Sequence, residues 1–87
     1  DDRTPLHMAA VAGQVGAIGF LLDRGAVIEA RDNSGMTPLH WAAARGQVGA
    51  IGFLLDRGAV IEAQASNGMT PLHRASVMGR VGAIGCL

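Results

Sequence analysis

The tetrapeptide Thr37-Pro38-Leu39-His40 decides the fold, because it occurs three times in this chain at one fixed spacing. The same four residues stand at 4–7 and at 70–73, which is 33 residues before and 33 residues after. A constant period of this size is typical of proteins that stack one repeated structural unit. The sequence therefore predicts a repeat architecture.

The first two copies of the unit are nearly identical. Residues 4–36 and 37–69 differ at only seven of 33 positions, and the segment 13–30 returns unchanged as 46–63. The seven differences are Met8/Trp41, Val11/Ala44, Ala12/Arg45, Arg31/Gln64, Asp32/Ala65, Asn33/Ser66 and Ser34/Asn67. Such self-similarity indicates either a recent duplication or a designed module.

Each unit carries the signals of two short helices. Thr37 is a good N-cap, Pro38 suits the first helical position and Gly46 suits a left-handed stop, which predicts a helix over 38–45. Apolar residues at helical spacing predict a second helix from about 48 to 57.

A loop completes the unit. The segment 59–63 is β-branched and predicted to be extended, and turn residues follow it at 66–68. Neither helix reaches the about 12 to 15 residues at which an isolated helix becomes marginally stable, so each depends on packing against its neighbours. We predict an all-α repeat fold of helix-turn-helix units joined by hairpin-like loops.

The period and the motif together resemble the ankyrin repeat. The signature Thr-Pro-Leu-His-x-Ala of that family stands here at 4–9, 37–42 and 70–75. The resemblance implies an ankyrin-type α-solenoid that forms one domain over residues 1–87. Its repeats span approximately 1–33, 34–66 and 67–87, the last one truncated, so we expect a piece of a longer chain.

The resemblance also implies roles for single residues. In ankyrin repeats the motif histidine hydrogen-bonds the threonine of its own motif and the loop of an adjacent repeat, and it stays neutral and buried. Structural roles are thus expected for Thr4, His7, Thr37, His40, Thr70 and His73. No metal site is expected, since histidines one repeat apart, about 10 Å, cannot share a zinc ion that binds its ligands at about 2.1 Å.

Recognition in this family usually involves the hairpin tips and the concave surface of the first helices, and the repeats of this chain differ in those two places. We therefore predict a protein-protein interaction module. Its predicted partner contacts are Arg31, Asn33, Ser34, Met36, Trp41, Ala44, Arg45, Gln64, Ser66, Met69, Arg74, Val77 and Met78. Trp41 is the strongest candidate, unless it packs between adjacent first helices. The alternative function is an engineered or structural scaffold with no natural ligand.

Composition and charge argue against other classes. Seven acidic residues balance seven arginines, so no net field attracts nucleic acid or an anionic membrane. No apolar stretch approaches the about 20 residues of a membrane helix. Glycine-rich segments such as 46–49 lack the lysine of a phosphate loop, and no nucleophile accompanies the carboxylates. We expect neither an enzyme nor a bound cofactor.

The single cysteine, Cys86, excludes an internal disulfide and favours a reducing compartment. We expect an intracellular location, cytoplasmic or nuclear. Because Cys86 replaces Phe20 and Phe53 at an apolar position, we also expect it in the core. The chain is expected to be a monomer, with end-to-end self-association through uncapped ends as the alternative.

Glycines in the second helices depart from the family pattern, which usually has Glu, Lys or similar residues there. They are Gly16, Gly19, Gly49, Gly52, Gly82 and Gly85. We expect them on the convex, solvent-facing side. Each costs about 1 kcal/mol relative to alanine in a helix interior, so we expect a marginally stable stack.

Overall fold

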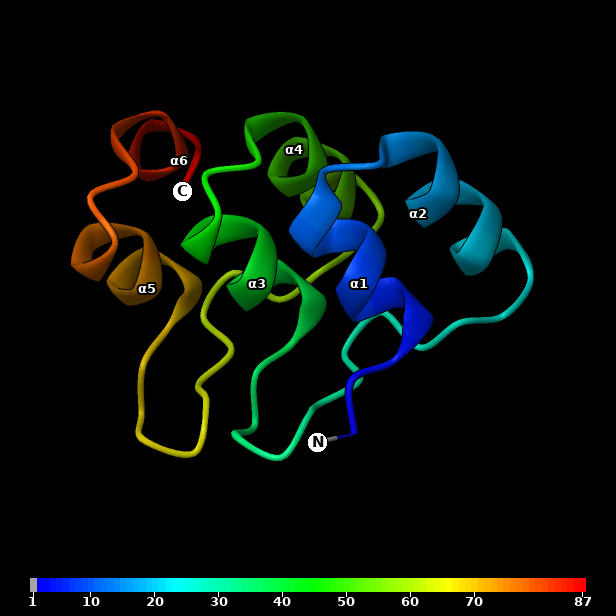
Figure 1. Cartoon of the computed structure of the whole chain (residues 1–87), viewed down its shortest axis with the longest axis horizontal. Helices are drawn as coiled ribbons and strands as arrows, with labels where there is room; N and C mark the ends of the chain where they lie inside the picture. The colour runs from blue at the N-terminus through cyan, green and yellow to red at the C-terminus, as the bar shows by residue number, and fades with distance from the viewer. Residues whose placement is uncertain (1) are drawn as a thin grey trace.

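Three pairs of α-helices make up the computed structural model, which describes residues 2–87. The first helices are α1 (Pro5–Ala12), α3 (Pro38–Ala44) and α5 (Pro71–Val77), and the second helices are α2 (Val15–Asp23), α4 (Val48–Asp56) and α6 (Val81–Cys86). No strand occurs among the described residues. The pairs lie side by side in chain order, with the second helices in one layer and the first helices in the other (Figure 1). The predicted all-α repeat stack is confirmed.

The first helices begin at the Thr-Pro-Leu-His motif for a local reason. In α3 the backbone N–H of His40 donates to Thr37 Oγ1 at 3.3 Å, and the backbone N–H of Thr37 donates to His40 Nδ1 at 3.1 Å. Each side chain thus satisfies a backbone donor that the first helical turn leaves without a partner. The same reciprocal cap begins α1 and α5.

The second helices have no such cap. In α4 the N-cap residue Gln47 makes no side-chain cap bond. Burial stabilises the helix instead, because Ile51 and Leu54 are both 0% exposed. Removing a leucine or isoleucine side chain from water contributes about 1.5 to 3 kcal/mol. The helix ends at Asp56, and Gly58 follows with a left-handed φ of 97°.

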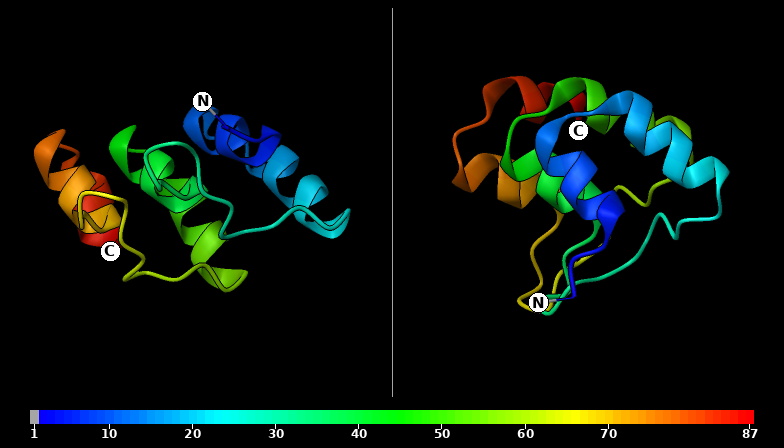
Figure 2. Two further views of the ribbon diagram at one scale, coloured as in Figure 1. Left: turned by 90° about the horizontal axis from the view of Figure 1, so that it is seen from below. Right: turned by 45° about the vertical axis from the view of Figure 1, so that its right-hand side comes forward.

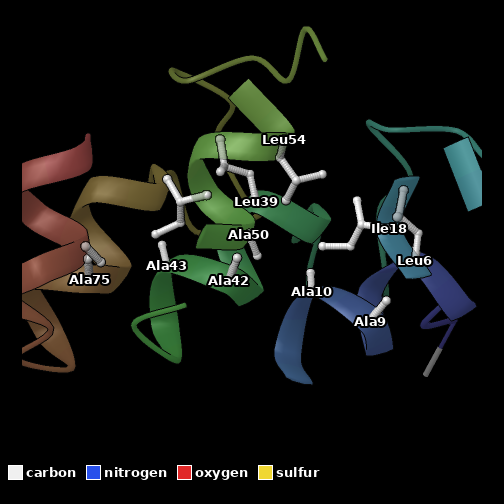
Figure 3. Close-up of a cluster of buried hydrophobic side chains, with 12 residues drawn as sticks. Leu6, Ala9, Ala10, Ile18, Leu39, Ala42, Ala43, Ala50, Leu54 and Ala75 are labelled. Carbon is white, nitrogen blue, oxygen red and sulfur yellow. The ribbon is translucent and has the colours of Figure 1, made fainter. Parts of the chain in front are cut away.

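The core lies between the two layers. Leu39 and the alanines at 42 and 43 of α3 meet Ala50 and Leu54 of α4, and related residues of the neighbouring repeats continue the same cluster (Figure 3). The small alanine side chains let the helices approach closely. The core therefore runs through the whole stack instead of being closed within one repeat.

The loops differ from expectation in one respect. Residues 59–63 do not form an extended strand, because Ala63 N–H donates to Val60 O and closes a turn. Beyond this turn the chain forms the expected hairpin tip, in which Ala65 N–H bonds Met69 O at 2.8 Å. The hairpins extend away from the helices (Figure 2).

The six helix glycines differ in the room around them, and at Gly49 an added Cβ would lie in ordinary contact, 3.7 Å from Val15 Cγ2. At Gly16, Gly52 and Gly85 an added Cβ would meet nothing within 4 Å, as expected for a convex surface. At Gly19 a Cβ would lie 3.1 Å from Phe53 Cζ, and at Gly82 it would lie 3.2 Å from Val48 Cγ2. Gly82 is nevertheless exposed, as expected, whereas Gly19 is half-buried, and at both positions a neighbouring second helix lies alongside.

Cys86 is exposed, so its expected place in the core is wrong. The equivalent Phe20 is itself 60% exposed. Phe53, the other equivalent, is half-buried, so an apolar residue at this position of the second helix does not by itself indicate full burial.

Candidate functional site

The surface at which the repeats differ is here called the variable surface. It comprises the first-helix and hairpin residues that the sequence predicts as partner contacts. Among these residues the exposed ones are Arg31, Asn33, Ser34, Arg45, Gln64, Ser66, Val77 and Met78, and the half-buried ones are Trp41, Met69 and Arg74. The structure thus leaves most of the predicted contacts accessible to solvent.

Two predicted contacts are not accessible and leave the set. Met36 is 6% exposed and Ala44 is 2% exposed. Both belong to the middle repeat, whose helix α3 packs against α1 on one side and α5 on the other. The flanking repeats therefore cover these side chains, whereas Val77, which is equivalent to Ala44, is 67% exposed.

Trp41 lies at the centre of the variable surface, and its orientation is defined by two neighbours. Its indole Nε1–H donates to Asp32 Oδ2 at 2.8 Å. The guanidinium of Arg3 lies over the ring, 5.2 Å from the ring centroid. An indole that is half-buried and held on both sides offers a rigid aromatic surface, a property common in residues that anchor interfaces.

Asp32 organises this part of the surface, although the sequence reasoning missed it. Its Oδ1 accepts the backbone N–H groups of Ser34 at 2.9 Å and Met36 at 3.0 Å, which closes the hairpin tip. Burial raises the pKa of Asp32, but the bonds from Trp41 and from these two N–H groups outweigh it and hold the pKa below 3.8. The sequence contains one signal that these two residues interact, because Asp32 and Trp41 are both replaced in the next repeat.

Arg31 connects two hairpins. Its Nη1 donates to Gly35 O at 2.7 Å and to Gln64 O at 2.6 Å, so it joins its own hairpin to the next one. Both acceptors are neutral carbonyls, which leave the positive charge of the guanidinium uncompensated. Arg31 therefore helps to hold the hairpins in register and also adds positive charge to the variable surface.

The residue that follows the motif histidine differs in each first helix. It is Met8 in α1, Trp41 in α3 and Arg74 in α5. Met8 is 53% exposed. Arg74 replaces the tryptophan in the third repeat, where Ala65 replaces Asp32. Arg74 Nε is buried and has no hydrogen-bond partner in the described part of the chain.

Two of the three motif histidines, His7 and His40, have the structural role that the family resemblance implies. His7 Nε2 bonds Met36 O and His40 Nε2 bonds Met69 O, both at 2.8 Å. Because the Thr37 N–H donates to His40 Nδ1, the ring is neutral and carries its proton on Nε2. His73 makes the same threonine bonds but is exposed.

The pKa of His40 lies below its ordinary value of 6.5. Burial is the largest cause, because it penalises the charged ring. The bond to Met69 O raises the pKa, yet it does not offset burial together with the charges of Arg31 and Arg74. His40 thus stays neutral as a link between repeats.

Further bonds between repeats escaped the sequence reasoning because their residues look unremarkable. Gln47 Nε2 donates to Val11 O at 2.9 Å, and the equivalent Arg80 donates from Nε to Ala44 O at 3.0 Å. An ion pair also joins two repeats, because Arg57 Nη2 lies 2.9 Å from Asp23 Oδ1.

The loops are linked across repeats in the same way. Glu29 Oε2 accepts the Val60 N–H of the next repeat at 2.9 Å. These side chains link repeats to one another and are not arranged around a ligand.

No described helix has the length and apolar character that crossing a membrane requires. Within residues 2–87 no three His, Cys, Asp or Glu side chains lie close enough together to hold a metal ion.

Comparison with known families agrees with the geometry. The family model for ankyrin repeats (3 copies) matches residues 1–65 and 29–87. The chain therefore belongs to the ankyrin-repeat family, whose members are generally protein-protein interaction modules and are typically not enzymes. A search of curated proteins gave no match.

Proposed function

We propose that this chain binds another protein through the variable surface, on the concave side formed by first helices and hairpin tips. One observation carries the proposal: the differences between nearly identical repeats gather among exposed residues of this surface, while the helix interiors stay the same. Packing requires the constant residues, whereas most of the differing ones are exposed and therefore available for recognition. The proposed binding involves no catalysis and no cofactor, and neither nucleic acid nor a membrane takes part in it. We also propose an intracellular location.

The chemistry of the surface suits a protein partner. Trp41 presents a rigid indole, and Arg45 lies one helical turn further along, where its side chain is exposed. Tryptophan and arginine are enriched among the residues that dominate interface energetics. Arg74, which is half-buried at the position equivalent to Trp41 in the third repeat, adds a second arginine to this surface.

A double substitution tests the proposal, because the chain contains a matched control. Trp41→Ala with Arg45→Ala removes the aromatic and the arginine from the variable surface. Phe20→Ala with Arg24→Ala removes a similar pair, with the same spacing, from α2, where Arg24 lies 5.3 Å from the Phe20 ring centroid. Chains with a photocrosslinking residue at 78 or at 23 would be used to capture partners from a lysate.

We expect one partner to be crosslinked from position 78 and not from position 23. The first double variant should lose this partner while its circular dichroism remains helical, and the second should retain it. Equal labelling from both positions, or loss of the partner in the second variant only, would place binding on the other side of the stack.

The second candidate function is a structural or engineered scaffold without a natural ligand. The identity of segments 13–30 and 46–63 favours it. It predicts that no protein is captured specifically from either crosslinking position, so the same experiment separates the two functions.

A further inference from the structure

The third repeat has an arginine where the second has a tryptophan, and it lacks the carboxylate that accompanies the tryptophan. Trp41 Nε1–H donates to Asp32 Oδ2 at 2.8 Å. One repeat further on, Arg74 and Ala65 occupy these two positions. The exchange replaces a neutral donor by a charged one and removes the acceptor beside it. A carboxylate placed beside Arg74 as Asp32 is placed beside Trp41 would form the stronger, charge-assisted hydrogen bond.

The hairpin of the third repeat closes without that carboxylate. Asp32 Oδ1 accepts the Met36 N–H at 3.0 Å, whereas the equivalent Met69 N–H donates to Asn67 Oδ1 at 3.1 Å. The neutral amide of Asn67 thus takes over the structural bond and adds no negative charge. The third repeat lacks only the other role of Asp32, which is to accept a hydrogen bond from the residue after the motif histidine.

Two further arginines of the variable surface are not paired with an acidic residue. Arg31 donates to two neutral backbone carbonyl oxygens. Arg45 is exposed, and within residues 2–87 no carboxylate forms an ion pair with it. By contrast, Arg57 at the end of the second helix α4 pairs with Asp23 at 2.9 Å. The positive charges of the variable surface are therefore the ones that remain available to a partner.

Charge is divided unevenly within a chain whose net charge is zero. The hairpin and first-helix segments 31–45 and 64–78 contain three arginines and one acidic residue, and that residue, Asp32, already accepts an indole N–H. The second-helix and loop segments 13–29 and 46–62 contain four acidic residues and two arginines. The variable surface thus has an excess of positive charge, which attracts an acidic partner and disfavours a basic one.

We propose that the variable surface binds an acidic peptide segment of its partner, whose aspartate or glutamate side chains pair with Arg45 and Arg74 while an apolar side chain packs on Trp41. The inference rests on the proposed binding function and specifies the chemistry of the partner. Arginine suits this task because its planar guanidinium binds a carboxylate through two parallel hydrogen bonds.

The spacing of these three side chains fits a short peptide. Arg45 follows Trp41 by four residues, which is about 6 Å along a helix. Arg74 belongs to the adjacent helix α5, and packed helices lie about 10 Å apart. An extended peptide advances about 3.3 Å per residue, so its carboxylates should stand about two or three residues from the apolar side chain.

Selection from a phage-displayed library of random peptides on the 87-residue chain tests the proposal. We expect the selected peptides to share aspartate or glutamate residues around an apolar residue. Fluorescence polarisation of one selected, labelled peptide should show about tenfold or weaker binding for Arg45→Gln and for Arg74→Gln. The matched control is Arg24→Gln, which removes the arginine that caps α2 and should leave the affinity unchanged.

Ala65→Asp is a test from within the chain. It places a carboxylate where Asp32 stands in the preceding repeat, so the new side chain should occupy Arg74 and weaken the selected acidic peptide about tenfold or more. The hairpin can accept the change, because Asp32 closes an equivalent hairpin with the same backbone bond, from 32 to 36 as from 65 to 69. Ala65→Asn, which is similar in size and uncharged, should retain most of the affinity. Circular dichroism checks that both variants are folded.

Three results would overturn the acidic-segment inference. The library could select no peptides, or only peptides without acidic residues. Ala65→Asp and Ala65→Asn could weaken binding equally, which would mean that the negative charge is not what competes. A peptide with phosphoserine in place of its glutamates could bind much more tightly than the selected one, which would assign the arginines to phosphate.

The crosslinking experiment with position 78 tests the binding function separately. A partner that is captured there, and lost in the double variant of Trp41 and Arg45, supports binding through the variable surface even when no acidic peptide is selected. That combination would reject the acidic segment and keep the binding function, so the two failures are distinguishable.

Discussion

The second and third repeats contain the same tetrapeptide, yet its side chains have different surroundings in the two places. His40 and His73 both accept a backbone N–H from their own threonine, so both helices begin in the same way. His40 is 0% exposed and bonds Met69 O, whereas His73 is exposed. Helix capping is thus a local property of four residues, and burial is a property of the neighbouring repeat.

The glycines lead to the same conclusion. Gly19 and Gly52 are equivalent, and both segments around them are identical in sequence. A Cβ on Gly19 would approach Phe53 of the following repeat, whereas Gly52 has open space. The residue that corresponds to Phe53 in the third repeat is the smaller Cys86. A change in one repeat therefore alters the room available in another.

The largest expected effect on stability comes from replacing the motif leucine in the second repeat and comparing it with the same substitution in the third. Leu39→Ala should destabilise the chain by about 2 to 5 kcal/mol, because it leaves a cavity in the middle of the core. Leu72→Ala should cost less than half as much, since Leu72 is already 40% exposed. Urea unfolding measures both. Equal losses would mean that the third repeat is buried in solution.

The motif histidine allows a second test of similar form. His40→Ala should cost about 2 to 4 kcal/mol, because it removes the cap and leaves the part-buried Met69 carbonyl without its donor. His73→Ala should cost about 1 kcal/mol, since only the cap is lost. Thermal unfolding followed by circular dichroism compares the two variants. A larger loss for His73→Ala would contradict the view that the following repeat provides the difference.

Acid should weaken the stack through His40. Its pKa in the folded chain lies below 6.5, so the unfolded chain binds the proton more readily. The stabilisation is complete above pH 6.5 and is lost as the pH falls from there towards the folded pKa, by at most about 1.4 kcal/mol per pH unit. Unfolding free energies between pH 7.5 and 5 measure this slope, above the range in which Asp32 titrates.

His40→Gln is the control for the pH series. This variant should be less stable at pH 7 but should show a flatter dependence on pH than the unmodified chain. An unchanged slope would assign the titration to another group.

The smallest expected effect concerns the glycines. Gly52→Ala should stabilise the chain by about 1 kcal/mol, because alanine is the better helix former and nothing occupies the space. Gly19→Ala should stabilise less, since its Cβ would lie 3.1 Å from Phe53 Cζ and the ring would have to move. Pairing Gly19→Ala with Phe53→Cys should restore the missing part of the gain. Equal gains for the two single variants would show that Phe53 does not restrict this site.

Most of the fold could be predicted from the sequence because its signals are local and occur three times. Thr37 and Pro38 begin α3 as expected, and the predicted end at 45 lies one residue beyond Ala44. The roles of the histidines followed from family resemblance and are confirmed for His7 and His40.

The candidate site was less predictable. Differences between repeats indicated the variable surface but did not distinguish Arg45, which is exposed, from Ala44, which is 2% exposed. Whether either contacts a partner remains a prediction. The bond from Trp41 to Asp32 joins residues nine positions apart, which no helical or strand periodicity brings together.

By itself, the sequence determined the repeat, its period and the start of each first helix, because capping and turn formation involve residues only a few positions apart. The tertiary structure decided which copy of each side chain is buried, which glycines have room for a methyl group and which arginines hold the hairpins together. These properties depend on the neighbouring repeat, and chemically identical segments therefore have different environments along the stack.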